Sequence, residues 1–137
     1  MPSPRENHLS VLMKQGMLTI KSDQLKILEQ AAFQDFEERM VLHIREFFPD
    51  NFDAMGEADS RLLIQHGIEQ AALYGFVSKQ DVCKFIDLMV CFGAEFDTDV
   101  NEPWAKAILS DNSLLNASDR MDALFNAGMG QLDNRPS

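Results

Sequence analysis

Apolar residues with helical spacing begin near residue 23. The segment "DQLKILEQAAFQDFEERMVLHIREFF" contains no Gly or Pro, and its apolar residues recur three or four positions apart, as in an amphipathic helix. Ser22 suits the N-cap of this helix. Pro49 ends it, because the residue before a proline disfavours the helical conformation. The pattern therefore predicts a first, long helix between these residues. The face that packs on the core carries Leu25, Leu28, Ala32, Phe36, Met40, His43 and Phe47.

A second helix is predicted over Ala58–Tyr74, after the connection "PDNFDAMGE". Gly75 follows it, where a left-handed C-cap is favoured. The apolar residues of this helix form two groups. Ile64, Ile68 and Ala71 face one way, whereas Leu62 and Leu73 face another. A helix exposed to solvent on one side would not need both groups, so we expect contacts on two sides.

The third helix is predicted over residues 79–92, "KQDVCKFIDLMVCF", and stops at Gly93. Ser78, just before it, and Asp81, in its first turn, form a pattern similar to a capping box, with Asp in place of Glu. Its apolar residues cover most of the circumference and leave a narrow polar strip with Lys84 and Asp87. A helix that is apolar nearly all round is buried. We therefore expect it to be the central helix of the fold.

Two further helices are predicted in the last third of the chain. Pro103 suits the first turn of the helix "PWAKAILS". Ser118 is expected to cap a fifth helix, with an apolar stripe of Met121, Leu124 and Phe125. Gly128 and Gly130 are expected to end it.

The pattern as a whole predicts an all-α fold, a single compact domain of about five helices. No repeat and no clear strand alternation is visible after residue 21. Residues 1–17 show no clear period and are predicted to be a mobile N-terminal arm. Residues 18–129 form the helical domain, and residues 130–137 are expected to be a disordered C-terminal tail.

Charge narrows the classes of partner. The 137 residues carry a net charge of −10, which opposes binding to nucleic acid or to anionic membrane surfaces.

The two cysteines, Cys83 and Cys91, lie eight positions apart on one predicted helix, about 12 Å apart and too far for a disulfide. Free thiols fit a reducing compartment, and the first residues carry charges where a signal peptide needs an apolar core. A cytoplasmic protein is therefore expected.

The stretch "EFDTDVNEP" gathers carboxylates between the third and fourth helices. Asp97, Asp99 and Asn101 match the first three ligand positions of an EF-hand loop. The match then fails, because Glu102 stands where a glycine must turn and Ile108 stands where a bidentate glutamate is needed. Asp and Asn also make turns and caps. We favour that interpretation, and a metal-dependent enzyme built on Asp97, Asp99 and Glu102 is an alternative.

Other candidate chemistry is sparse. His43 falls on the apolar stripe of the first helix and is interpreted as a core histidine with a satisfied ring. His66 and Glu69 form one reversed copy of a di-iron motif, which needs two forward copies. Cys83 or Cys91 could meet a histidine in space, which sequence cannot show. We expect no catalytic residues, no cofactor and no metal ligands.

Aromatic residues gather near helix ends and loops, and they are either core residues or anchors for a partner. We favour a core role. If this region does bind a partner protein, the predicted contact residues are Phe76, Phe96, Asp97, Asp99 and Trp104.

Several segments together resemble a known group of proteins. They are "REFFP", "GIEQAALYGF", "DVCKFIDLMVCFGAEFDTD" and "PWAKAIL", within a resemblance that spans Leu18 to Ala127. The group comprises small helical accessory proteins encoded beside type VI secretion effectors, spike-tip PAAR proteins and effector adaptors. The resemblance implies a non-enzymatic chaperone or co-chaperone, and it carries no catalytic residues.

The resulting hypothesis is a cytoplasmic, non-enzymatic binding protein, an accessory chaperone or adaptor component for a secreted effector. An immunity protein that neutralises a basic toxin is the first alternative, because the net charge is strongly negative. The sequence leaves the oligomeric state and the contact face open.

Overall fold

The computed structural model describes residues 30–111, 113 and 116–134. Within them the chain forms five α-helices and no strand, which confirms the predicted compact all-α fold. The predicted arm over residues 1–17, the cap at Ser22 and the last three residues of the tail lie outside the described residues. The helices are α3 (Gln30–Phe47), α4 (Pro49–Leu73), α5 (Lys79–Phe92), α6 (Pro103–Leu109) and α7 (Ala117–Asp133).

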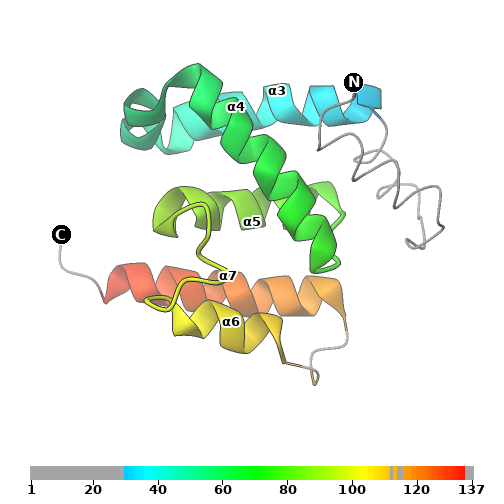
Figure 1. Ribbon diagram of the computed structural model, residues 1–137, viewed down its shortest axis with the longest axis vertical. Helices are drawn as coiled ribbons and strands as arrows, with labels where there is room; N and C mark the ends of the chain where they lie inside the picture. Colours follow the sequence, from blue (N-terminus) through cyan, green and yellow to red (C-terminus); the bar gives the residue numbers. More distant parts are fainter. Residues whose placement is uncertain (1–29, 112, 114–115, 135–137) are drawn as a thin grey trace.

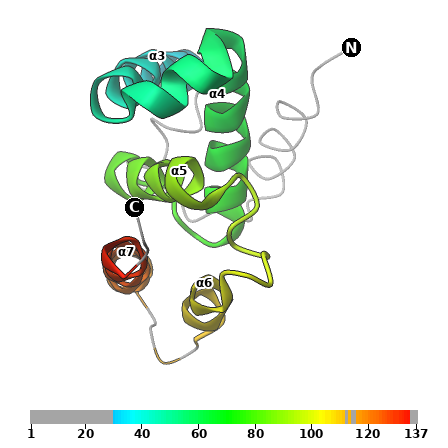
Figure 2. The same ribbon diagram turned by 90° about the vertical axis from the view of Figure 1, so that its left-hand side faces the viewer.

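The helices stack in three tiers (Figures 1 and 2). α3 and α4 pack together at one end, α6 and α7 lie side by side at the other, and α5 lies between the two pairs. α5 packs against α3, α4 and α7. Seven of its fourteen residues are buried, among them Phe85, Ile86 and Leu88. One core therefore runs from the α3–α4 pair through α5 to α7.

The segment between α3 and the predicted second helix is helical, so the expected connection there is wrong. α3 ends at Phe47 as predicted, but Pro49 starts α4 at once, since proline is favoured in the first turn of a helix. Only Gly56 leaves the helical conformation, with φ of 81° and ψ of 166°. The Ser60 hydroxyl donates to the Gly56 carbonyl at 2.7 Å. Gly56 therefore marks a kink within α4 rather than a loop before it.

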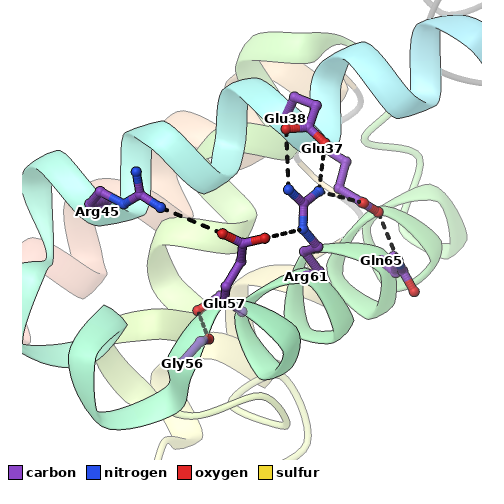
Figure 3. A network of polar contacts seen from close by, with 8 residues as sticks. Glu37, Glu38, Arg45, Gly56, Glu57, Arg61 and Gln65 are labelled. Atoms are coloured by element: carbon purple, nitrogen blue, oxygen red, sulfur yellow. Dashed lines mark hydrogen bonds and ion pairs between the residues drawn. The ribbon is translucent and has the colours of Figure 1, made fainter.

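A network of charges joins α3 to α4 across the kinked region (Figure 3). Arg61 of α4 donates to Glu38 at 2.7 Å and to Glu37 at 3.1 Å, both on α3. It also donates to Glu57 of α4 at 3.2 Å, and Arg45 of α3 lies 3.6 Å from Glu57. The hydrogen bonds that Arg61 donates to Glu38 and Glu37 raise the pKa of its guanidinium. One guanidinium thus connects three carboxylates from two helices.

The junction from α4 to α5 follows its local sequence closely. Gly75 has φ of 88°. Its N–H bonds to the Ala72 carbonyl at 3.0 Å, and the Phe76 N–H bonds to the Ala71 carbonyl at 2.9 Å, which is a Schellman motif. The Ser78 side chain accepts from the Asp81 N–H and starts α5 at Lys79, as predicted.

The predicted limits of the last helix are wrong at both ends. Asn116, not Ser118, caps α7, because the Asn116 side chain accepts from the N–H groups of Ser118 and Asp119. The helix continues through Gly128 and Gly130 to Asp133, so this part of the predicted disordered tail is helical. Neither glycine has a positive φ. Gly128 instead allows close packing, since a Cβ there would lie 2.5 Å from Leu88 Cδ2.

Candidate functional site

The corner between α5 and α6, together with the first turn of α6, holds four of the five residues that the sequence singled out for partner binding. The chain leaves α5 at Gly93, whose φ is 111°. Successive backbone hydrogen bonds then link residues three apart, from Phe96 to Gly93, from Asp99 to Phe96 and from Glu102 to Asp99. The corner is therefore a run of tight turns that leads into Pro103 at the start of α6.

Each acid of the corner has its own partner within the protein. The Tyr74 hydroxyl donates to Asp97 Oδ2 at 2.6 Å. The Asn101 N–H donates to Asp99 Oδ1 at 2.8 Å, which closes an Asx turn. The Trp104 indole donates to Glu102 Oε2 at 2.6 Å. The three carboxylates thus bind a phenol, a backbone amide and an indole.

This arrangement does not bring the acids together around an ion. Among the described residues, no set of three ligand atoms within 4.8 Å includes Asp97, Asp99 or Glu102. A surface hollow of about 510 Å³ lies beside the corner and is lined by Asp99, Val100 and Lys106 among others, but not by Phe96 or Trp104. The contacts are those of loop residues that shape the backbone.

The aromatic candidates differ in what a partner can reach. Phe76 and Phe96 are fully buried, and the rings of both pack against Phe85 at centroid distances of 6.1 and 5.2 Å. Trp104 is half-buried, and Asp99 is partly exposed. Direct contact with a partner in this conformation would fall to Trp104 and Asp99. The binding role of the whole set stays a prediction.

Burial shapes the electrostatics of the corner. Asp97 is 3% exposed, and its Oδ1 atom has no hydrogen-bond partner among the described residues. Burial raises the pKa of Tyr74, and the hydrogen bond to Asp97 raises it further. Tyr74 therefore stays neutral and keeps its hydroxyl proton to donate. The buried Asp97 carboxylate needs such a donor, because a buried acceptor without a hydrogen bond destabilises the fold.

A second cluster of reactive side chains lies where α3 meets α5. His43 comes from α3, and Cys83 and Asp87 lie one turn apart on α5. His43 Nε2 lies 2.8 Å from Asp87 Oδ1 and 3.9 Å from Cys83 Sγ. Among the described residues, these three form the one set of His, Cys, Asp or Glu whose ligand atoms all lie within 4.8 Å of one another. All three side chains are partly exposed.

Two phenylalanine rings flank the histidine of this cluster, and the charge of Lys84 acts on Cys83. The rings of Phe47 and Phe48 lie 4.9 and 6.2 Å from the His43 ring. Burial raises the pKa of the Cys83 thiol to about 12, with a further contribution from the charge of Asp87. Burial also raises the pKa of Asp87, although His43 opposes that effect.

The contacts exclude a catalytic triad. In a Cys–His–carboxylate triad, one ring nitrogen accepts the thiol proton and the other donates to the carboxylate. Here Cys83 and Asp87 both lie against Nε2 of His43, and one nitrogen cannot do both. A thiol with a raised pKa is also a poor nucleophile at neutral pH.

The sequence pattern does not predict this cluster, although part of its signal is local. Asp87 and Cys83 are four residues apart, so they lie on one helix face. His43 was interpreted as a core histidine with a satisfied ring, and Asp87 does partner it. The forty residues between His43 and Cys83 hide their proximity, because only the packing of α3 against α5 creates it.

The outer side of α4 is a third feature. Ile64, Ile68 and Ala71 are buried, as predicted for one side of this helix. Leu62 and Leu73 on the other side are 61% and 58% exposed. The expected second contact is therefore not made by the described residues.

These features define a small helical protein of three tiers, with a turn-rich corner and a half-buried His–Cys–Asp cluster. A scan against models of protein families found no match, and searches of curated proteins and of solved structures found none either. Among the described helices, none has the length and apolar character needed to cross a membrane. The resemblance to proteins associated with secretion stays a prediction.

Proposed function

We propose that this protein is a non-enzymatic binding protein that holds a partner protein against the outer side of α4. The observation that carries the proposal is the pair of exposed leucines there. At about 100° per residue, Leu62 and Leu73 lie within roughly 20° of each other and nearly opposite the buried Ile64. They are about 16 Å apart along the helix.

Such a surface has the composition of a binding face. Large apolar side chains in its centre would be buried by a partner, and polar residues would surround them. Asp59 is exposed beside Leu62, and His66 lies between the leucines, with Nε2 at 3.0 Å from the exposed Glu95. The acidic residues favour a partner with basic groups around an apolar centre.

The sequence resemblance supplies the class of partner. On that basis the partner is a type VI secretion effector or its adaptor, and the protein acts as an accessory chaperone in the cytoplasm. Its mechanism is stoichiometric burial of apolar surface, and it requires no catalytic group.

Binding to the effector or adaptor encoded beside this protein tests the proposal. Leu62→Glu and Leu73→Glu should each weaken the measured Kd by about tenfold or more, because truncating or charging a central anchor costs more than about 1.4 kcal/mol. Leu42→Glu is the matched control, since Leu42 is also a leucine and is 59% exposed, but it lies on α3. Unchanged affinity in both leucine variants would overturn the proposed face.

The immunity alternative is supported by the net charge of −10, which suits a basic toxin. Co-expression separates the two roles. An immunity protein rescues cells from active toxin, whereas a chaperone raises the amount or secretion of toxin without protecting the cell.

A further inference from the structure

We propose that His43, Cys83 and Asp87 form a binding site for a zinc-class divalent metal ion between α3 and α5. The site lies away from the outer side of α4, and the inference does not depend on the proposed partner. Its ligand atoms would be His43 Nε2, Cys83 Sγ and a carboxylate oxygen of Asp87.

The distances are close to those a tetrahedral ion requires. With Zn–S near 2.3 Å and Zn–N or Zn–O near 2.1 Å, tetrahedral ligand atoms lie about 3.3 to 3.6 Å apart. The Sγ–Nε2 distance is 3.9 Å and the Nε2–Oδ1 distance is 2.8 Å. Small side-chain rotations that move the ligand atoms by roughly half an ångström bring both distances into this range. The ion would then take the place of the proton between His43 and Asp87.

The backbone already presents the donors from rigid elements. Cys83 and Asp87 project from successive turns of α5, one of the most buried helices of the fold. His43 lies within α3, four residues before its end. An ion at this point would cross-link the two helices, and the donors need no loop to reorganise.

The donor types select the metal. A thiolate and an imidazole suit Zn²⁺ and its neighbours, whereas Ca²⁺ and Mg²⁺ prefer oxygen ligands. One thiolate and one carboxylate also balance the two charges of the ion, so the occupied site is neutral in half-buried surroundings. Three protein ligands leave a fourth tetrahedral position for water.

Nearby residues fit an outer shell. Phe47 and Phe48 place apolar rings next to the histidine, and an apolar shell controls solvent access at metal sites. Cys91 lies two turns beyond Cys83 on α5, and its thiol is not part of the set. Cys91 therefore provides an internal control for the thiol ligand.

Cobalt(II) is the probe, because it occupies zinc sites and absorbs visible light. Metal-free full-length protein should bind one equivalent and show the cobalt–thiolate charge-transfer band with the intense visible bands of tetrahedral cobalt. Excess Zn²⁺ should remove both. Zn²⁺ should also raise the Tm of the wild-type protein, since an ion that binds only the folded state stabilises it.

Variants locate the ligands. Cys83→Ser should abolish the cobalt–thiolate band, and His43→Gln and Asp87→Asn should each weaken zinc binding by about tenfold or more. Cys91→Ser and His66→Gln are matched controls that should keep wild-type spectra and affinity. Circular dichroism confirms that each variant is folded.

Three results would overturn the site. They are cobalt binding no tighter than millimolar, a thiolate band that survives Cys83→Ser in folded protein, and a band that Cys91→Ser removes instead. A metal-binding failure would leave the proposed α4 face untouched, because that face is tested by partner affinity.

Discussion

At the scale of single residues, the acids of the α5–α6 corner act on the local structure. Asp97, Asp99 and Glu102 each bind a different donor, from a tyrosine, a backbone amide and a tryptophan. The pattern that resembles the start of an EF-hand therefore arises from three separate structural tasks. Asp97 is the most buried of the three acids, and its coupling to Tyr74 can be measured.

The single tyrosine of the chain makes that coupling visible by absorbance. Burial and the bond to Asp97 raise the pKa of Tyr74, so tyrosinate absorbance in the folded protein should appear well above pH 10. Asp97→Asn should move the midpoint down towards 10, and Asp99→Asn should leave it unchanged. Because the folded state keeps the proton longer than the unfolded chain, the free energy of unfolding should fall as pH rises above 10. If Asp97→Asn left the midpoint of the tyrosine titration unchanged, the bond to Asp97 would not be a cause of the raised pKa.

The thiol of Cys83 should be unreactive in the metal-free protein. Its pKa is raised to about 12 by burial and then by the charge of Asp87. The thiolate is the reactive form, and about one thiol in ten thousand would be ionised at pH 8. The test uses the Cys91→Ser variant with chelator present. Iodoacetamide should react with the folded protein at least about 100-fold more slowly than with the protein unfolded in urea. Equal rates would show that the site does not protect the thiol.

At the scale of elements, glycine has two different uses. Gly75 and Gly93 end helices with positive φ, as their positions after apolar runs predict. Gly67 and Gly128 lie inside helices and allow close packing. A Cβ at Gly67 would lie 2.6 Å from Ile86 Cγ1 and 2.8 Å from Met89 Sδ. These contacts set how closely α4 approaches α5.

Alanine substitutions separate packing from helix propensity. Gly67→Ala should destabilise the protein by about 1–3 kcal/mol, because extra volume in a packed contact forces its neighbours to shift. Gly130→Ala should stabilise it by about 0.5–1 kcal/mol, since a Cβ there meets nothing within 4 Å and glycine disfavours a helix interior. Urea unfolding measures both. Equal stabilisation by the two changes would show that α4 and α5 are less tightly packed.

The Arg61 network is a second contact between elements. Arg61→Met removes the cation that contacts all three of Glu37, Glu38 and Glu57, so the Tm should fall because like charges are left together. Added salt should reduce the loss, since it screens exposed charges. Arg39→Met is the control, because Arg39 pairs only with the exposed Asp35 in the described contacts. A loss independent of salt would point to packing rather than charge.

At the scale of the whole molecule, α5 joins the two ends of the structure. α3 and α6 lie at opposite ends (Figure 1), and one apolar core connects them through α5. A single domain of this size usually unfolds in one cooperative step. The only tryptophan, Trp104, lies in α6 and reports on the end remote from α3.

Removing core volume in α3 tests this cooperativity. Ile44 is fully buried, and Ile44→Ala should cost about 2–5 kcal/mol through lost burial and the cavity left behind. The urea midpoint from Trp104 fluorescence should fall as far as the midpoint from circular dichroism. Leu42→Ala, at an exposed position of the same helix, should change neither. If the urea midpoint measured by Trp104 fluorescence stayed at its wild-type value in Ile44→Ala, the two ends of the structure would unfold separately.

The sequence by itself determined the all-α class and the limits of α5, because these depend on local features. Apolar spacing, the Ser78 cap and the Gly93 stop act within a few residues and need no distant partner. The end of α3 at Phe47 and the Schellman motif at Gly75 followed from the same local rules.

The tertiary structure alone decided the features that depend on distant residues. Gly56 became a kink and Gly128 a packing contact, although both glycines carry the same local signal as a helix end. Leu62 and Leu73 remained exposed because the described core contacts only the opposite side of α4. His43, Cys83 and Asp87 came together because packing α3 against α5 brings residues about forty positions apart within a few ångströms, a distance that no local pattern encodes.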